Sequence, residues 1–266
     1  MKIIQITDTH LVMSGQTVHG VDPEKHLRAA IDDIILKHGD ADLLVMTGDL
    51  CNFGEPEAYE ILRDILAPLQ TEVRLLLGNH DDRDNFIAAF PDHPRDGKGY
   101  IQSCLDTDFG RLLFLDSHQR DVIGGIYNEY RMAFLSDALA QAGETPVTLF
   151  VHHPPMDCGI AHFDRIGMHD DGAMMRTLAA HEGGVRHIVF GHIHVPLAGT
   201  SAEGIAYSSG QACAHRFITD ITSPVPFWTG GNPCYRIIML DEKGFRAYGV
   251  EVGETITGQA PVCEGP

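Results

Sequence analysis

The sequence predicts a layered α/β sandwich whose last third is rich in β-strands. Over the first two thirds of the chain, short apolar runs alternate with amphipathic segments, which is typical of strands joined by helices. The later part has short strand candidates separated by glycine and proline turns. The chain has 266 residues, 44% of them hydrophobic, and can bury the core of one large domain. We therefore expect a single domain over residues 1–266, with two smaller domains as the alternative.

Three apolar runs predict the first strands, at residues 2–6, 43–46 and 73–77. The segments between them, residues 22–37 and 55–66, predict helices, because their apolar residues recur at helical spacing and a proline stands in the first turn of each. Each strand ends at a turn that contains acidic, amide or histidine side chains. The order of strand, turn and helix is therefore repeated along the chain.

Later strands are predicted in two sets, at residues 111–116, 147–151 and 186–190, and then at residues 204–208, 235–240 and 245–250. Residues 218–233 lie between two of the predicted strands and are rich in proline, glycine and aromatic side chains. We predict a projecting loop there. The loop is either a plain surface connection or a lid or dimer arm, since exposed aromatic side chains often mark contacts.

Polar side chains stand at the ends of five predicted strands. They are Asp8, Asp49, Asn79, His152 and His192, each at, or one to three residues past, the end of an apolar run. Open α/β sheets bind ligands at the carboxyl edge of their strands, where loops converge on a rigid support. Five segments that are distant in the sequence are therefore expected to deliver these side chains to one place.

Two further histidines, His10 and His194, follow Asp8 and His192 by two residues. Because successive side chains of a strand alternate between its faces, each pair is expected to project to one side. The donors are carboxylate, carboxamide and imidazole groups without a thiolate, which suits divalent ions such as Mn, Fe, Zn, Co or Ni. Asp49 has two carboxylate oxygens and follows the central strand, so it is the candidate ligand shared by two cations.

Glycines stand directly before three of the ligand candidates, at Gly48, Gly78 and Gly191. The backbone there is expected to need a close approach or a positive φ. Taken alone, Asp49 could cap a turn and His192 could be an ordinary buried histidine. Coincidence is a poor explanation for several separate blocks that each follow the end of a predicted strand.

Five blocks occur between residues 8 and 194: Asp8-Thr9-His10, Gly48-Asp49, Gly78-Asn79-His80-Asp81, His152-His153-Pro154-Pro155 and Gly191-His192-Ile193-His194. The set resembles the calcineurin-like metallophosphoesterases, and the order is that of the family. DxH or GD alone would carry little weight, but the blocks together are highly specific. The GNHDD and HHPP strings and the compact length are most similar to the bacterial class III cyclic nucleotide phosphodiesterases and glycerophosphodiesterases.

The resemblance implies a four-layer αββα sandwich of two mixed sheets flanked by helices, with two divalent metal ions per chain. It implies that one ion is bound by Asp8, His10, Asp49 and His194, and that the other is bound by Asp49, Asn79, His152 and His192. The implied activity is hydrolysis of small phosphodiesters, either cyclic nucleotides or glycerophosphodiesters, by a hydroxide that bridges the metals.

The expected catalytic residues are His80, Asp49 and Asn79. His80 directly follows Asn79, an implied metal ligand, but the resemblance does not make His80 itself a ligand. We expect His80 to hydrogen-bond the phosphate, beside Asn79, and to stabilise or protonate the leaving oxygen. Either Asp81 or Asp82 is expected to orient the imidazole of His80.

His153 and His215 are candidate substrate contacts, although an ordinary structural histidine explains each of them equally well. The remaining histidines are interpreted as background, among them His19, His26, His38, His93 and His181. The six cysteines form no CxxC pair, so reduced thiols are expected. Cys51 lies near the predicted site, and we interpret it as a small buried hydrophobic residue.

The formal charge of -18 disfavours general nucleic-acid binding through a basic surface. The first residues carry no basic leader, and no apolar run approaches the roughly 20 residues of a membrane-spanning helix. We therefore expect a soluble, cytoplasmic protein without a membrane partner. The resemblance and the segment around Trp228 favour a homo-oligomer, either a dimer or a larger assembly.

Four other functions compete with a phosphodiesterase. A phosphomonoesterase or a nucleotide pyrophosphatase would use the same centre, because the metal chemistry hardly distinguishes them. A nuclease is disfavoured, since Lys and Arg total only 19 and no basic run occurs. A non-catalytic scaffold would be expected to have lost ligands or the histidine after Asn79, and both are retained.

Overall fold

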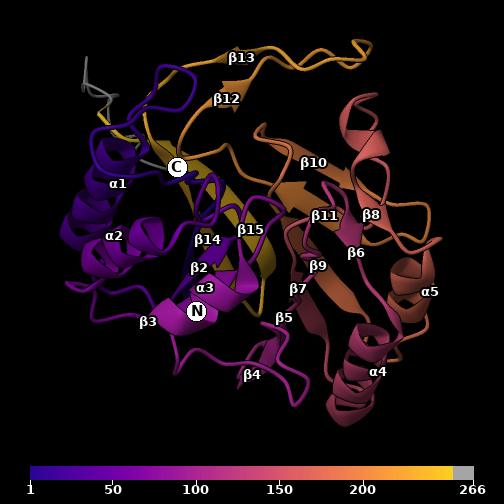
Figure 1. Ribbon diagram of the computed structural model, residues 1–266. Coiled ribbons are helices and arrows are strands. Elements are labelled where there is room, and N and C mark those ends of the chain that lie inside the picture. The colour runs from indigo at the N-terminus through magenta and orange to yellow at the C-terminus, as the bar shows by residue number, and fades with distance from the viewer. Residues whose placement is uncertain (254–266) are drawn as a thin grey trace, which may run out of the picture.

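Two β-sheets pack face to face and helices cover the outer face of each, which gives the protein four layers (Figure 1). The computed structural model describes residues 1–253. The first sheet has the strand order β15-β14-β1-β2-β3. Its strands are β1 (Lys2–Ile6), β2 (Leu43–Thr47), β3 (Glu72–Leu76), β14 (Cys234–Asp241) and β15 (Gly244–Glu251). The first three run parallel, whereas β14 is antiparallel to β1 and β15 is antiparallel to β14.

The second sheet has the strand order β10-β11-β9-β7-β5-β4. Its strands are β4 (Ser103–Thr107), β5 (Gly110–Phe114), β7 (Val147–Phe150), β9 (Val185–Phe190), β10 (Leu197–Thr200) and β11 (Ala206–Ser209). The four central strands run parallel, and β4 and β10 close the sheet as antiparallel edges. Two short ladders lie outside the sheets and pair β6 (Gly125–Ile126) with β8 (Met168–His169) and β12 (Arg216–Phe217) with β13 (Trp228–Thr229).

Helices on the two outer faces complete the sandwich. They are α1 (Pro23–His38), α2 (Pro56–Leu66) and α3 (Arg83–Ala89) on the side of the first sheet, and α4 (Glu129–Ala142) and α5 (Ala173–Ala179) on the side of the second, with a short 3-10 turn at Phe163–Arg165. Asp22 caps α1 by accepting a hydrogen bond of 3.1 Å from Lys25 N, and a proline opens both α1 and α2.

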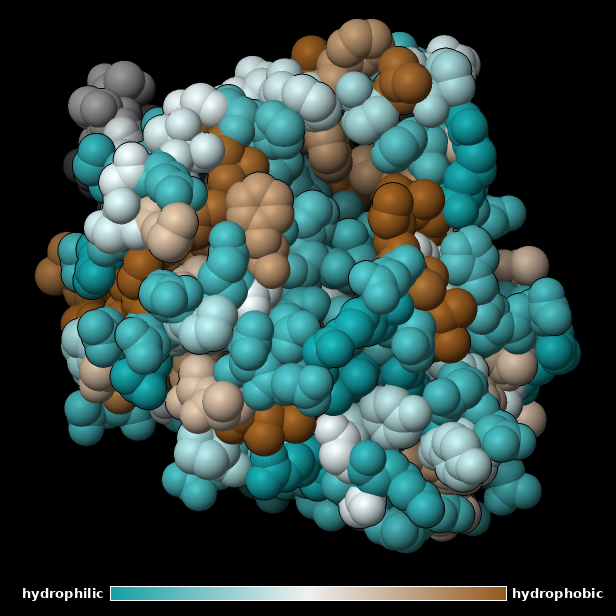
Figure 2. Space-filling model, viewed as in Figure 1, coloured by the Kyte–Doolittle hydropathy of each residue, from teal (hydrophilic) through white to brown (hydrophobic). Residues whose placement is uncertain are grey.

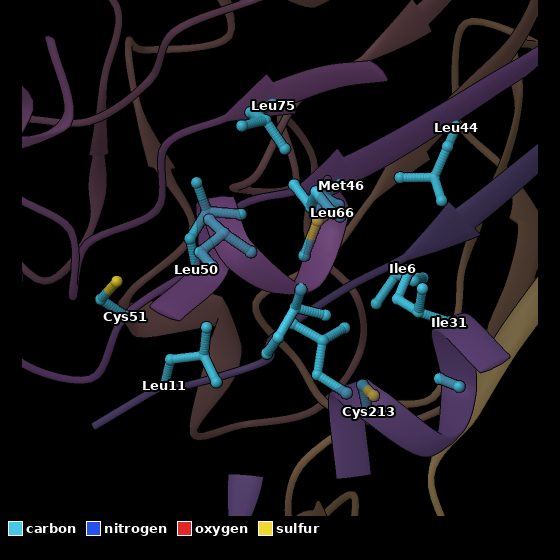
Figure 3. Packing of buried hydrophobic residues seen from close by; sticks show 14 of the residues in the cluster. Ile6, Leu11, Ile31, Leu44, Met46, Leu50, Cys51, Leu66, Leu75 and Cys213 are labelled. Atoms are coloured by element: carbon cyan, nitrogen blue, oxygen red, sulfur yellow. The ribbon is translucent and has the colours of Figure 1, made fainter. Parts of the chain in front are cut away.

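Hydrophobic clusters fill the three interfaces between the layers. Figure 3 shows the first, where Ile31 of α1 and Leu66 of α2 pack with Leu44 and Met46 of β2. The alternate residues of β2, such as Val45, face the second sheet instead. A third cluster joins the second sheet to α4 and α5. Because both faces of β2 are buried, the strand is a continuous apolar run.

The predicted four-layer αββα sandwich with two mixed sheets is confirmed, and the predicted strands are observed with their ends displaced by at most two residues. The sequence reasoning did not identify three helices, α3, α4 and α5, or the edge strands β4 and β10. α3 and α5 have only seven residues each. The buried face of α4 consists of small residues, one leucine pair and the buried Arg131, so its apolar periodicity is weak.

The segment at residues 218–233 is not wholly a loop. Trp228 pairs with Phe217 and Thr229 pairs with Arg216, so part of the segment folds back on residues 216–217 and forms a short antiparallel β-ribbon. Figure 1 shows this ribbon, β12 and β13, projecting above the sandwich. The predicted domain extends to residue 266, and its residues 254–266, with Cys263, lie outside the described part.

The side of the molecule shown in Figure 2 is mainly hydrophilic, with hydrophobic residues gathered in a few separate patches. None of the helices within residues 1–253 is both long enough and apolar enough to cross a bilayer. Cys51 is fully buried in the cluster beneath α2, as expected for a small hydrophobic residue.

Candidate metal centre

Five loops bring polar side chains from both sheets to one place. They follow β1, β2 and β3 in the first sheet and β7 and β9 in the second. Three groups of side chains have potential ligand atoms within 4.8 Å of one another: Asp8, His10, Asp49 and His194; His152, His153 and His192; and His10, His194 and His215. The sequence-predicted ligands of the two sheets therefore converge.

The first group contains two carboxylates and two imidazoles. His194 Nε2 lies 3.3 Å from Asp8 Oδ1 and 3.0 Å from His10 Nε2. His10 Nε2 lies 3.6 Å from Asp49 Oδ2. All four side chains are buried. Such a cluster of buried ring nitrogens and carboxylate oxygens is a donor set that suits a divalent cation.

Asp49 turns its other oxygen toward a second group of donors. Asp49 Oδ1 lies 3.4 Å from His152 Nε2. In the described part of the chain, His152 Nε2, His192 Nε2 and Asn79 Oδ1 are buried without a hydrogen-bond partner. A buried polar atom without a partner is rare and costly. A cation bound among these atoms would give each of them a partner, so the two groups of donors fit a binuclear metal site.

Hydrogen bonds on the far side of three imidazoles fix the direction of their Nε2 atoms. His152 Nδ1 lies 2.7 Å from Thr47 O, and His194 Nδ1 lies 2.8 Å from His215 O. His10 Nδ1 lies 3.0 Å from Asn52 Oδ1. Each Nδ1 faces an oxygen that accepts its proton, which leaves Nε2 with a lone pair for a metal.

The backbone at five ligand positions is left-handed. Asp8, His10, Asp49, His192 and His194 have φ values of 53°, 45°, 49°, 68° and 55°. Non-glycine residues rarely adopt this region, and its strain is retained mainly at functional sites. These residues lie past the ends of β1, β2 and β9, so the alternation of side chains along a strand does not determine the direction in which their side chains point.

The two pairs predicted from strand alternation behave differently. Asp8 and His10 do lie in one group, although a turn brings them together. His192 and His194 lie in different groups, although both line one cavity. The turn after β9 thus supplies one imidazole to each group.

The electrostatic surroundings keep the carboxylates ionised. Burial alone would raise the pKa of Asp49, but the imidazoles of His152 and His80 hold it well below the usual carboxyl range. Burial likewise opposes ionisation of Asp8, and His194 lowers the pKa of Asp8 to about 2. Both groups are therefore carboxylates near neutral pH, as metal ligands must be.

Close approach explains the glycines before the ligands. A Cβ at Gly78 would overlap Asp49 Oδ1 and would lie 2.6 Å from His152 Nε2. Gly48 has a φ of 93°, and a Cβ there would overlap the His152 ring. A side chain at either position would occupy space that the ligands need.

We expect Gly78→Ala to reduce both metal binding and stability, because the added methyl displaces Asp49 and His152. The free energy of unfolding should fall by about 1–3 kcal/mol, the usual cost of overpacking. Thermal denaturation and metal titration measure the two effects. Gly97→Ala is the matched control, since a Cβ at Gly97 would have no atom within 4 Å. Equal behaviour of the two variants would contradict the close-packing argument.

His80 lies at the mouth of the centre. Its backbone N–H donates to Asp49 Oδ1 at 2.9 Å, and its Nδ1 lies 2.9 Å from Asn52 O. The side chain is exposed to the cavity above the donors, so Nε2 is the ring atom available to a substrate. The Asn52 carbonyl, which the sequence reasoning did not identify, orients the imidazole.

Asp81 and Asp82 bond to other groups. Asp81 accepts hydrogen bonds from the backbone of Leu50, Cys51 and Gly78 and from the hydroxyl of Tyr59. It thereby ties the loop after β2 to the loop after β3. Asp82 caps α3 and pairs with Arg120 at 2.8 Å. Their hydrogen bonds within residues 1–253 do not include His80, so neither aspartate orients it directly.

His153 and His215 differ in what their ring nitrogens contact. His153 Nδ1 lies 2.8 Å from Ser117 Oγ and its Nε2 lies 3.1 Å from Ile123 O, so both nitrogens are bonded to protein behind the centre. His215 lines the cavity, and its Nδ1 is buried without a partner among the described residues. The structure therefore places His215, but not His153, where a substrate can reach it.

A cavity of about 190 Å³ opens above the donors. Trp228 of β13 lines it and stacks on His19, with ring centroids 3.9 Å apart. His19, which the sequence analysis interpreted as background, therefore belongs to the site. Its φ of 50° and the following Gly20 mark a tight turn, but the residue pattern gives no reason to join that turn to residue 228.

Comparisons with known proteins agree with this geometry. Residues 1–196 match the family model described as calcineurin-like phosphoesterase. A Rhodopseudomonas palustris protein named "probable cyclic nucleotide phosphodiesterase" is 34% identical over 226 residues, which are 84% of this chain and 82% of the relative. A glycerophosphodiester phosphodiesterase of Enterobacter lignolyticus is 29% identical over 198 residues, which are 73% of this chain and 71% of the relative.

One solved structure resembles the whole sandwich. The dimetal phosphatase from Danio rerio superposes with a TM-score of 0.70 at 14% sequence identity, over 95% of this chain and 99% of the other. At this identity the likeness supports the four-layer fold. The support for the chemistry comes from the side chains described above.

Proposed function

Because this chain belongs to the calcineurin-like phosphoesterase family, we propose that it hydrolyses small phosphodiesters, either cyclic nucleotides or glycerophosphodiesters. The observation that carries the proposal is the position of Asp49 between two groups of buried donors. Relatives named as cyclic nucleotide and glycerophosphodiester phosphodiesterases support the substrate class.

The proposed ligands of one cation are Asp8, His10, Asp49 and His194, and those of the other are Asp49, Asn79, His152 and His192. The mixture of nitrogen and oxygen donors suits Mn, Fe, Zn or Co. When bound, two such ions would neutralise the charge of a phosphodiester and acidify a water for in-line attack.

The chain's own residues would position the substrate. Because His80 Nδ1 donates to Asn52 O, Nε2 faces the substrate, and in the doubly protonated imidazolium form Nε2 can donate to a phosphate oxygen or to the departing alkoxide. His215 lines the same cavity and offers a second imidazole. The rings of His10 and His80 lie edge to face with centroids 4.7 Å apart, which holds the imidazole of His80 over the first group of donors.

The β12–β13 ribbon is proposed to hold the alcohol part of the substrate. Phe217 and Trp228, one from each strand of the ribbon, line the cavity beside His19. Trp228 is 50% exposed and stacks on His19 with one face of its ring, which leaves the other face for a partner. A nucleobase would stack on such an indole, whereas glycerol would gain little from it.

We expect Trp228→Ala to raise the KM for cyclic AMP by roughly fivefold or more, which is the lower range for loss of base stacking. The kcat should change little, because Trp228 is not among the metal-ligand candidates. The KM for a glycerophosphodiester should stay constant, since that substrate has no base. Steady-state kinetics on the two substrates measures the difference.

Phe227→Ala is the matched control for this prediction. Phe227 precedes Trp228, is 55% exposed and does not line the cavity. The control variant should have the wild-type KM for both substrates. If the KM of the Trp228 variant rose equally for both, a general effect on the ribbon would replace stacking as the explanation.

Exposed apolar side chains on the same segment support a homo-oligomeric contact. They are Ile218, Ile221, Val225 and Phe227, each more than half exposed. We expect an assembly of two or more chains, and multi-angle light scattering measures its mass. A monomer would contradict this part of the proposal and leave the catalytic part unchanged.

Turnover of five substrates tests the proposed activity: bis(p-nitrophenyl) phosphate, p-nitrophenyl phosphate, cyclic AMP, a glycerophosphodiester and a dinucleotide pyrophosphate, each with added divalent metal. A phosphodiesterase should prefer diesters over the monoester in kcat/KM. A preference for the monoester would favour a phosphomonoesterase. Faster cleavage of a dinucleotide pyrophosphate than of any diester would favour a pyrophosphatase, and salt-sensitive binding of DNA would favour a nuclease.

A further inference from the structure

A second and larger cavity lies away from the five metal-ligand loops. It has a volume of about 720 Å³ and is lined by residues of β14 and β15 of the first sheet and of β9, β10 and β11 of the second. Its size is within the range of small-molecule sites. Apolar side chains, including Leu197 and Phe245, form much of its wall.

An arginine without a charged partner lines this cavity. The side chain of Arg236, on β14, is 7% exposed. Its Nη1 donates to Ser209 O at 2.7 Å and to Ser208 Oγ at 3.1 Å. Within residues 1–253, its Nε and Nη2 are buried without a hydrogen-bond partner, and no carboxylate pairs with it. Burial lowers the pKa of Arg236 to about 10, which leaves it a cation near neutral pH.

The two free nitrogens form one edge of the guanidinium. Nε and Nη2 point in the same direction, and this edge is the one that binds a carboxylate through two parallel hydrogen bonds. A buried cation with two unsatisfied donors is costly unless an anion reaches it. The donors that the protein leaves free therefore match a carboxylate in both charge and shape.

The neighbouring strand leaves open space opposite Arg236. Gly249 of β15 is the direct partner of Arg236 in the ladder, and a Cβ at Gly249 would have no atom within 4 Å. Ala247, the next residue on the same face of β15, is also small and exposed. Two small residues thus keep the approach to Arg236 open.

The charges around the cavity select an anion with a single charge. His187 packs flat on Phe245, with ring centroids 3.7 Å apart, and burial lowers the pKa of His187 to about 3, so it is neutral. Glu251 also lines the cavity, held by Arg216 at 3.2 Å. One cation and one carboxylate at the rim disfavour a dianion.

We propose that this cavity binds a carboxylate monoanion with an apolar body. The carboxylate pairs with Nε and Nη2 of Arg236, and the apolar body packs along Leu197 and Phe245. The site uses none of the metal-ligand candidates and is independent of the proposed phosphodiesterase activity.

Isothermal titration calorimetry of the full-length, metal-containing protein with octanoate tests the site. Octanoate should bind, and octan-1-ol should bind at least roughly 30-fold more weakly, the lower range for loss of a buried charge pair. Arg236→Met should weaken octanoate binding by a similar factor. Absence of octanoate binding to the wild type, or equal affinity for the alcohol, would overturn the proposal.

A second variant keeps the test valid if Arg236→Met fails to fold. Gly249→Leu leaves Arg236 in place but fills the space beside it, and it should abolish octanoate binding with no change in the thermal unfolding midpoint beyond that of the surface control Gly97→Ala. Asn79→Ala, at the metal centre, should bind octanoate as the wild type does. Binding that survives Gly249→Leu but is lost in Asn79→Ala would assign the carboxylate to the metals and refute the site.

Discussion

Asp49→Ala is expected to abolish turnover and to empty both proposed metal positions. The two oxygens of Asp49 face different groups, with Oδ2 3.6 Å from His10 Nε2 and Oδ1 3.4 Å from His152 Nε2. Removing them leaves each group of donors without its shared carboxylate. Metal ions supply several kcal/mol of transition-state stabilisation, so kcat/KM should fall by roughly 1,000-fold or more.

Metal content by plasma mass spectrometry and turnover of bis(p-nitrophenyl) phosphate measure the two effects. Asp106→Ala is the control, because it removes an exposed carboxylate that pairs with Arg111 far along the chain from the ligand loops. The control should retain metal and activity. Full metal content in the Asp49 variant would show that the two groups do not share this carboxylate.

His80→Ala is expected to retain both metals and to slow the reaction by roughly 10²- to 10⁴-fold, the range for loss of a general acid. His80 is exposed at the mouth of the centre, and its ring is held by Asn52 O, so its removal leaves the buried donors in place. Metal content and single-turnover rates separate binding from chemistry.

The leaving group provides a sharper test of the role of His80. p-Nitrophenolate departs without a proton, whereas the alkoxide released from cyclic AMP requires stabilisation. The His80→Ala loss should therefore be much smaller for bis(p-nitrophenyl) phosphate than for cyclic AMP. Equal losses on both substrates would assign His80 to phosphate binding alone, and loss of metal would make it a ligand.

The parts of the fold that could be predicted from sequence are the strands and helices whose buried residues form a clear apolar pattern. β2 is buried on both faces, so its five residues read as a strand without further context. α4 was not predictable in the same way, because its buried face includes Arg131, whose guanidinium donates to His118 O at 2.8 Å. A helix that buries a charged residue, with its hydrogen bonds satisfied by tertiary contacts, lacks the continuous apolar stripe from which a buried helix is predicted.

The candidate site was predictable where a motif and a strand end coincide, as at Asp49 and Asn79. The geometry that positions these residues was not. The resemblance assigns His192 and His194 to different ions, but the left-handed backbone angles of the turn that holds them are not indicated by the residue pattern. Likewise, His19 and Trp228 are distant in sequence and meet only because β13 folds back over the turn that contains His19.

The central claim is that two cations bind on either side of Asp49. Anomalous diffraction from crystals grown with Mn²⁺ tests it most directly. We predict two anomalous peaks per chain about 3.5 to 4 Å apart, each within bonding distance of a different oxygen of Asp49. A single peak, or two peaks of which one does not contact Asp49, would contradict the account.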